Sequence, residues 1–217
     1  MAAVKRKYDA TSRQAAAAAT RDRICAAAEQ LFLRDGYART SIRAVASTAG
    51  VAEATIYLAF ANKAVLLNAV ILRAVRDNSS EPLDVIAAAP PHEIIPRLAS
   101  AASLLMARAG RLIALGESAT FMDAELRPFR EQARLRLHTA FRHVADRLDH
   151  AGLLRVDVQS AADILYVINS ETTYLRMIDD VGLPADGYAR WLADTLTAIL
   201  LRAEGAETQR RSSDRQV

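Results

Sequence analysis

The sequence predicts an all-α protein in which three short N-terminal helices precede a larger helical part, with about nine helices in all. Three observations predict this class. Apolar residues recur at spacings of three and four in most segments, as in amphipathic helices. No segment shows convincing strand alternation, and the sequence contains no internal repeat. Prolines are absent up to Glu81 and then crowd the next stretch at Pro82, Pro90, Pro91 and Pro96, which marks a boundary.

The composition is that of a soluble globular protein, with 217 residues, 52% hydrophobic and 24% charged. A single cysteine, Cys25, excludes an internal disulfide and a multi-cysteine zinc site, which suits a reducing cytoplasm. The first apolar tract is alanine-rich and unlike a secretory signal, and every apolar run is interrupted before 18 residues. We therefore expect a cytoplasmic protein that does not span a membrane.

The first 17 residues are expected to form a flexible basic and alanine-rich tail, because they combine an alanine run with Lys5, Arg6, Lys7 and Arg13. Two interpretations stay open. The tail could be a basic arm that reaches phosphates or a minor groove, or it could only keep the protein soluble.

A helix is predicted from about Thr20 to Gly36. Its apolar residues stand at i, i+3, i+4, i+7 and i+8, which makes one core-facing stripe, and a glycine follows its end: Ile24, Ala27, Ala28, Leu31 and Phe32. This helix would cover the two shorter helices that follow.

Residues 41–60 predict a helix-turn-helix motif. Thr40 is a candidate N-cap for a helix over 41–48, which places Val45 and Ala46 on its inner face. Gly50 can take a positive φ at the turn, and a second helix over 52–58 turns Ile56 inward. This arrangement presents the second helix to the major groove of DNA.

The distribution of charge agrees with that motif. Residues up to Arg76 contain 12 Lys and Arg against 5 Asp and Glu, whereas residues 77–217 contain 16 against 20. The basic end is therefore the end with the helix-turn-helix, as phosphate binding requires. The alternative is that solvated helices carry the excess arginine.

The rest of the chain predicts a connector helix over 63–78, apolar on nearly all sides, and further helices in a second domain over 79–204. The further helices are expected at 92–109, 112–120, 123–151, 158–178 and 185–203, with a polar tail over 205–217. The first domain would comprise residues 18–78.

Residues 36–66 resemble the TetR family of bacterial transcriptional regulators, through the pattern GY..T....VA..AGV...TIY..F..K..L. The resemblance implies a homodimeric, ligand-responsive regulator, usually a repressor, that binds a palindromic operator. It also implies phosphate contacts from Thr40, Tyr57 and Lys63. The exposed face of the second helix is then expected to meet base edges through Ala52, Glu53, Ala54 and Thr55, together with Arg43 from the helix before it. The sequence departs from the family at Ala52, where serine often caps the helix, and at Ala54, Leu58 and Ala59.

The family dimerises through a four-helix interface, which would use the helices at 158–178 and 185–203 here. The last of these carries a wide apolar stripe that includes Tyr188, Trp191, Leu192, Leu196 and Leu200. Packing within one chain is the alternative.

The resemblance also implies a small-molecule effector among the middle helices. The candidate pocket residues are Met106, Phe121, Met122, Phe141, Tyr166, Glu171 and Tyr174, and the alternative is that they are ordinary core. Glu171 lies on an apolar stripe between Ile164 and Ile178, so it would be either an interface hydrogen-bonding group or a pocket group.

Nothing in the sequence predicts an enzyme or a cofactor. His143, Asp146 and His150 share one helix face and could hold a metal, but Arg142 and Arg147 beside them favour a solvated flank. Two alternatives remain to the ligand-responsive regulator: a DNA-binding regulator without an effector, and a helical metal-dependent enzyme.

Overall fold

The computed structural model describes residues 2–78 and 81–203, with side chains from Gln14 onward. It confirms the all-α class, because that part of the chain holds helices and one isolated antiparallel bridge, between Leu154 and Leu201, but no strand. The chain forms two compact units. Unit 1 comprises Met1–Asp77 with Arg111–Arg130, and unit 2 comprises Asn78–Gly110 with Glu131–Val217. The sequence analysis placed its domain boundary at residue 78 and assigned residues 111–130 to the second domain.

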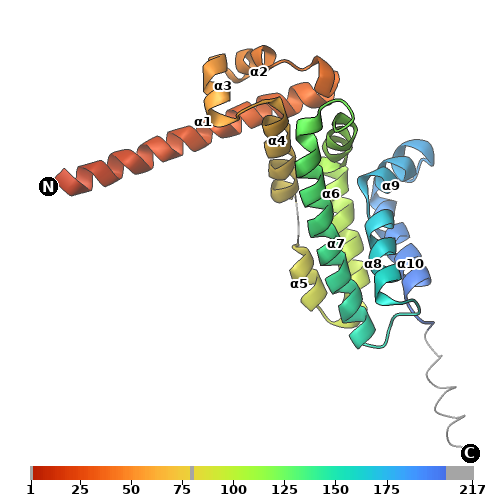
Figure 1. Ribbon diagram of the computed structural model, residues 1–217. Helices are drawn as coiled ribbons and strands as arrows, with labels where there is room; N and C mark the ends of the chain where they lie inside the picture. The colour runs from red at the N-terminus through yellow and green to blue at the C-terminus, as the bar shows by residue number, and fades with distance from the viewer. Residues whose placement is uncertain (1, 79–80, 204–217) are drawn as a thin grey trace, which may run out of the picture. The chain divides into compact units, whose positions relative to one another are not determined.

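Unit 1 is built on α1 (Ala2–Arg39), which packs against α2 (Ile42–Ala49), and α2 in turn contacts α3 (Glu53–Ala59) (Figure 1). The connector α4 (Lys63–Asn78) and the short 3-10 helix η1 (Ala124–Leu126) complete the unit. Its core includes inward-facing residues predicted for the first three helices, together with Phe60 and residues of the connector, all fully or almost fully buried: Ile24, Ala28, Leu31, Phe32, Val45, Ile56, Phe60, Leu66, Leu67 and Val70.

Helix α1 begins at Ala2, whereas we expected the helix from about Thr20 and a flexible tail before it. Alanine has the highest helix propensity, and the exposed run Ala15–Ala19 continues the helix without tertiary packing. The predicted break is present, because Gly36 has φ 80° inside the helix. Residues 204–217 and the side chains of residues 1–13 lie outside the described residues, so the polar tail and the basic arm remain predictions.

Within unit 1, the segment 111–130 contacts the N-terminal helices through specific groups. The Tyr37 hydroxyl donates to Asp123 Oδ2 at 2.5 Å, and Asn62 Nδ2 donates to Glu125 Oε2 at 2.5 Å. Gly116 lies so close to Ile71 of α4 that a Cβ there would clash with the Ile71 Cδ1 atom. The segment is therefore held to α1 by one hydrogen bond, to Asn62 just before α4 by another, and to α4 itself by the close approach of Gly116.

Unit 2 contains α5 (Leu83–Ala88), α8 (Val158–Ile168), α9 (Glu171–Leu175), a π-helical turn η2 (Arg176–Asp180), a 3-10 turn η3 (Ala185–Gly187) and α10 (Tyr188–Leu200). It also contains residues 91–110 of α6 (Pro91–Ala119) and residues 131–150 of α7 (Arg127–His150). Helices α8 and α10 lie side by side (Figure 1). The core lies among these helices, with Ile94, Leu98, Phe141, Leu165 and Leu192 at its centre.

Three helix boundaries in this region differ from the prediction. Helix α5 was not expected, α6 continues through Gly110 to Ala119 instead of ending at 109, and the helix expected over 158–178 breaks at Asn169. A glycine within a helix costs only about 1 kcal/mol relative to alanine, which the packing of α6 offsets. At Asn169 the next helix starts anew, because the Ser170 hydroxyl accepts from the backbone N–H of Thr173.

Helix α6 is, by length and composition, apolar enough to cross a membrane. Its residues Ile94, Ile95 and Leu98 are buried in the core of unit 2, and 33% of its most apolar 18-residue window is buried.

Candidate nucleic-acid interface

The turn between α2 and α3 is fixed by backbone hydrogen bonds. Gly50 has φ 64°, its N–H donates to Ser47 O at 3.3 Å, and the N–H of Val51 donates to Ala46 O at 3.0 Å. This pair of bonds is a Schellman motif, which needs a residue in the left-handed region and so favours glycine. The predicted glycine turn is therefore present.

The N-cap of α2 is Ser41 and not Thr40. Ser41 Oγ accepts from the N–H of Ala44 at 3.1 Å. The Thr40 hydroxyl is buried and donates to Gly36 O at 2.8 Å, so it closes the break in α1. The predicted cap was one residue early, because Ser and Thr both suit this position and the sequence alone does not fix the helix start.

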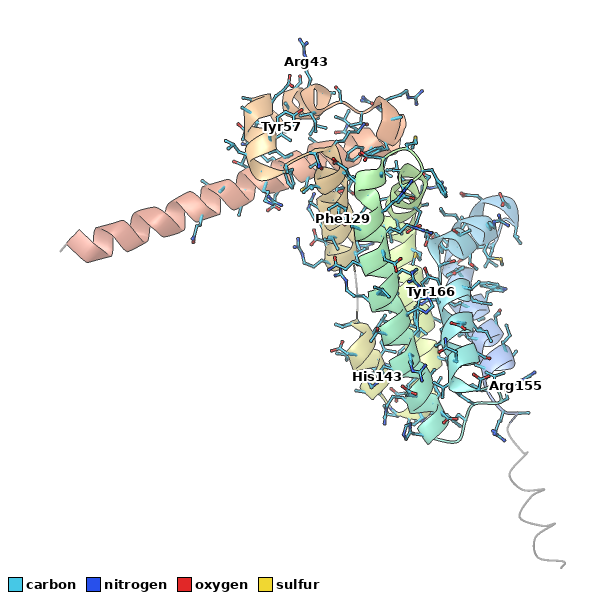
Figure 2. All side chains as sticks on the ribbon, in the orientation of Figure 1. Arg43, Tyr57, Phe129, His143, Arg155 and Tyr166 are labelled. Atoms are coloured by element: carbon cyan, nitrogen blue, oxygen red, sulfur yellow. The ribbon has the colours of Figure 1, made fainter. Side chains whose placement is uncertain are left out.

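Helix α3 hides one side chain and exposes most of the others. Ile56 is fully buried, whereas Tyr57 is 53% exposed and Leu58 is 90% exposed. Ala52, Glu53 and Ala54 are also exposed, and Thr55 is half-buried. Figure 2 labels Tyr57 on α3 and shows Arg43 extending outward from α2. The residues predicted to meet DNA on α3 therefore share an accessible face that Ile56 orients.

The two ends of α3 are held differently. Ala52 provides no side-chain cap, as its departure from the family pattern implied. At the other end, Arg21 of α1 donates from Nη1 to Ala59 O, and its guanidinium lies 4.1 Å from the centroid of the Phe60 ring. A cation at a helix C-terminus stabilises the helix, so Arg21 positions α3. The sequence analysis missed this residue, although its place three residues before Ile24 puts it near the packed side of α1.

Lys63 is engaged within unit 1. Its Nζ lies 4.2 Å from the centroid of the Tyr37 ring and donates to Ala38 O at 3.4 Å. Burial lowers the pKa of Lys63, and nearby Asp123 partly counteracts this. Burial and the hydrogen bond to Asp123 raise the pKa of Tyr37, so this phenol remains a donor. The ammonium is thus held in one place by weak partners, which a phosphate can replace.

The charged side chains of unit 1 differ in whether the described residues give them a partner. Arg43 is exposed and has no hydrogen bond or ion pair within the described part of the chain. By contrast, Arg34 pairs with Asp35 at 2.8 Å, and Arg73 pairs with Glu29 and Asp77. Arg43 is therefore available to an external anion.

The candidate pocket residues do not form one group, which corrects the prediction. Phe121 and Met122 follow α6 in unit 1 and are 87% and 59% exposed, so they line no cavity of unit 2. A turn over residues 120–123 places them outside any helix, where the helical spacing assumed for them does not apply.

The other candidate pocket residues lie in unit 2. Met106 and Tyr174 meet at Gly110, and Phe141 is buried in the core. Tyr166 stacks on His138 with 4.2 Å between ring centroids. Glu171 is half-buried in the first turn of α9 and accepts from the Thr172 hydroxyl at 3.2 Å. The break at Asn169 removes Glu171 from the apolar stripe on which the sequence had placed it.

The stripe assigned to dimerisation on the last helix is divided. Tyr188, Leu192, Leu196 and Leu200 are fully buried within the same chain, which corrects the interpretation of the whole stripe as a dimer surface. Trp191 and Ile199 are half-buried, and Val167 on α8 is 63% exposed. The faces left for a partner are narrower than the sequence suggested.

The side chains of His143, Asp146 and His150 share a helix but are not gathered around one point. In the described residues no three His, Cys, Asp or Glu side chains come together as a metal-binding group. His150 Nδ1 lies 2.6 Å from Asp146 O, and Arg147 donates to Ala87 O at 2.9 Å. His143 is exposed and lines a shallow groove between α5 and α7.

The helix-turn-helix region and the fold were compared with those of known proteins. A profile of bacterial regulatory proteins of the tetR family matches residues 24–70. No curated protein sequence matches. Among solved structures, NalD, the secondary repressor of the MexAB-OprM multidrug efflux pump in Pseudomonas aeruginosa, is 24% identical, with a TM-score of 0.66 over 85% of this chain and 96% of its own.

Two further solved structures share the fold and contain small molecules. SmeT, the repressor of the Stenotrophomonas maltophilia efflux pump SmeDEF, in complex with triclosan, is 20% identical, with a TM-score of 0.71 over 86% of this chain and 93% of its own. A protein from Saccharomonospora viridis in complex with choline is 20% identical, with a TM-score of 0.69 over 85% and 99%. The helix-turn-helix region of the chain thus matches the profile of bacterial regulatory proteins of the tetR family, and the chain as a whole shares the fold of these solved structures.

Proposed function

We propose that the protein is a cytoplasmic, ligand-responsive repressor that binds a palindromic operator as a homodimer and leaves it when a small molecule binds unit 2. The observation that carries this proposal is the exposed face of α3, which Ile56 orients from beneath while Tyr57 and Leu58 stay accessible.

The roles proposed for the candidate DNA-contacting residues follow from the chemistry of their side chains. Tyr57 and Lys63 can donate to phosphate oxygens, which positions the protein without reading sequence. Arg43 on α2 can donate to a base edge. Glu53 can accept from a cytosine amino group, and Ala54 can contact a thymine methyl group. Thr40 is withdrawn from this set as a side-chain donor, because its hydroxyl is buried and already bonded to Gly36 O.

A homodimer is supported by apolar side chains left on the surface of α8 and its neighbours. Val167 is exposed, and Ile164, Trp191 and Ile199 are half-buried although all are apolar. Two recognition helices from a symmetric dimer would enter successive major grooves about one helical turn apart, which accounts for a palindromic site.

Effector control is supported by the small molecules in complexes of SmeT and of the Saccharomonospora viridis protein. It is also supported by the course of α6, which leaves unit 2 at Gly110 and continues into unit 1. In unit 1 the same segment is fastened to α1 and α4 by Asp123, Glu125 and Gly116. A ligand that displaces α6 in unit 2 would thereby shift the equilibrium between DNA-binding and non-binding conformations of the protein.

The DNA-binding part is tested by selecting duplexes from a random pool with the purified protein. We expect a near-palindromic consensus, and analytical ultracentrifugation of the complex should give an even number of subunits per duplex. An enriched sequence without two-fold symmetry, bound by a monomer, would overturn the proposal.

The regulatory part is tested with a reporter gene placed behind the selected operator. We expect repression that depends on Tyr57 and Arg43, and release of the operator by at least one member of a chemically diverse panel. If DNA binding is intact and no compound releases it, the alternative holds, namely a DNA-binding regulator without an effector.

A further inference from the structure

We propose that the Tyr188 hydroxyl is the hydrogen-bond donor of the effector site, and that the effector is an uncharged aromatic compound with a carbonyl or ether acceptor. The site lies in unit 2, where Tyr188 of α10 meets Tyr174 of α9, and Tyr174 meets α6. This inference rests on the proposed effector control and assigns a ligand class to it.

Tyr188 is unusual because its hydroxyl lacks a partner. The side chain is fully buried, and its oxygen has no hydrogen-bond partner within the described part of the chain. Buried polar groups are nearly always bonded, and one left unsatisfied is costly. A phenylalanine would fill the same space without that cost, so the hydroxyl indicates a partner that comes from outside the chain.

The surroundings of the hydroxyl are aromatic and apolar. The rings of Tyr174 and Tyr188 meet edge to face with 4.8 Å between centroids, and the ring of Trp191 lies 5.5 Å from that of Tyr188. At Gly110, the position a Cβ would take lies 3.6 Å from Met106 Cβ and 3.7 Å from Tyr174 Cδ1. Aromatic faces and a flexible methionine accept a flat apolar ligand by small rearrangements.

The charge state of the ligand follows from this environment. None of these side chains is charged, so an anion would find no counter-charge there. Burial raises the pKa of Tyr188 to about 12, and the phenol therefore stays a neutral donor at physiological pH. A donor without a partner selects an acceptor, which a carbonyl or ether oxygen supplies.

The backbone beside the cluster is irregular where it carries Tyr174. Helix α9 has only five residues and passes directly into the π-helical turn Arg176–Asp180. Such turns occur often at functional sites, because they break the regular ladder of hydrogen bonds. The Asn169 side-chain oxygen, where α8 ends, is likewise buried, with no hydrogen-bond partner among the described residues. This end of unit 2 is thus less regular than α10, which carries Tyr188.

The test uses matched probes that differ only in an acceptor: benzophenone with diphenylmethane, and acetophenone with ethylbenzene. Trp191, the only tryptophan, reports binding by its fluorescence. We expect the full-length protein to bind at least one carbonyl probe about five- to tenfold more tightly than its hydrocarbon partner. In Tyr188→Phe this preference should disappear, with the hydrocarbon affinity unchanged.

A second measurement separates a ligand-binding role from a structural one. Ligand-free Tyr188→Phe should unfold at the same temperature as the wild type or higher, because a hydroxyl without a partner contributes no stability. A clear loss of stability, equal carbonyl affinity in the two proteins, or no binding of either carbonyl probe would each overturn the inference.

Failure of the proposed effector control can be distinguished from failure of the Tyr188 site. If the carbonyl probes bind in the Tyr188-dependent way but none releases the operator, the site stands and the proposed regulation fails. If other compounds release the operator equally well from Tyr188→Phe and wild type, regulation stands and this site assignment fails.

Discussion

The two units present their functional groups in opposite ways. In unit 1, the candidate DNA-contacting residues lie on the outside of a short helix that one buried side chain, Ile56, holds in place. In unit 2, the candidate effector group Tyr188 lies inside a core of long helices. A surface site needs a rigid support beneath it, whereas an internal site needs neighbours that can move. This difference predicts how substitutions in each unit should act.

The largest expected effect is that of Ile56→Ala. Removing a fully buried isoleucine from a core costs roughly 2–5 kcal/mol, and unit 1 has few helices to absorb the loss. We expect operator binding to disappear together with part of the stability in urea. The matched control is Leu58→Ala, since Leu58 is 90% exposed and should leave stability nearly unchanged. Equal stability losses for the two variants would mean that α3 is not anchored through Ile56.

Gly116→Val tests whether the end of α6 works with the DNA-binding unit. The new side chain would collide with Ile71 of α4, and overpacking of this kind costs about 1–3 kcal/mol. We expect weaker operator binding although residue 116 is distant in sequence from α3. The double variant with Ile71→Ala should recover much of the loss, as measured by urea unfolding and by mobility-shift titration.

Gly110→Ala is the control in the same helix. A Cβ at this position meets Met106 and Tyr174 at ordinary contact distances, so stability and DNA binding should stay close to wild type. If Gly110→Ala weakens operator binding as much as Gly116→Val, then the contact of residue 116 with Ile71 has no special role in DNA binding.

The success of the sequence analysis differs between the units for the same physical reason. In residues 36–66 each signal is local: Gly50 needs a positive φ, and Ile56 lies on the only inward face of a seven-residue helix. Those features are written in neighbouring residues, so the motif, its turn and its exposed face could be predicted. The cap at Ser41 was missed by one residue, because two adjacent hydroxyl residues compete for that position.

Long-range packing could not be predicted in this way. Tyr188 belongs to a stripe that suits a dimer surface and a core equally well, and only its long-range packing, such as its contact with Tyr174, decides between them. Phe121 and Met122 are residue types that often line ligand pockets, but they lie in an exposed turn. Arg21 holds α3 from 38 residues away in sequence, which no periodicity reveals.

Lys63→Ala is expected to weaken operator binding by roughly tenfold, the effect of one charged hydrogen bond to phosphate. A phosphate contact carries no sequence information, so the loss should be similar for all duplexes, and the salt slope should fall by about one. Arg142→Ala in unit 2 is the charge-matched control and should change neither quantity. A change in which operator is preferred would show that Lys63 reads bases.

The smallest predicted effect is a gain. Helix α2 has a side-chain cap at Ser41, but α3 has none at Ala52, where only the backbone carbonyl accepts from Thr55 N–H at 2.9 Å. In Ala52→Ser, the new hydroxyl can accept from the N–H of Thr55, just as the Ser41 hydroxyl accepts from the N–H of Ala44. This bond should stabilise unit 1 by about 0.5–1 kcal/mol. Ser41→Ala should lose a similar amount, and urea unfolding of both variants measures the pair. If Ala52→Ser is neutral in stability while Ser41→Ala is costly, the start of α3 is already satisfied by other means, and its exposed face owes its order to Ile56 and Arg21 alone.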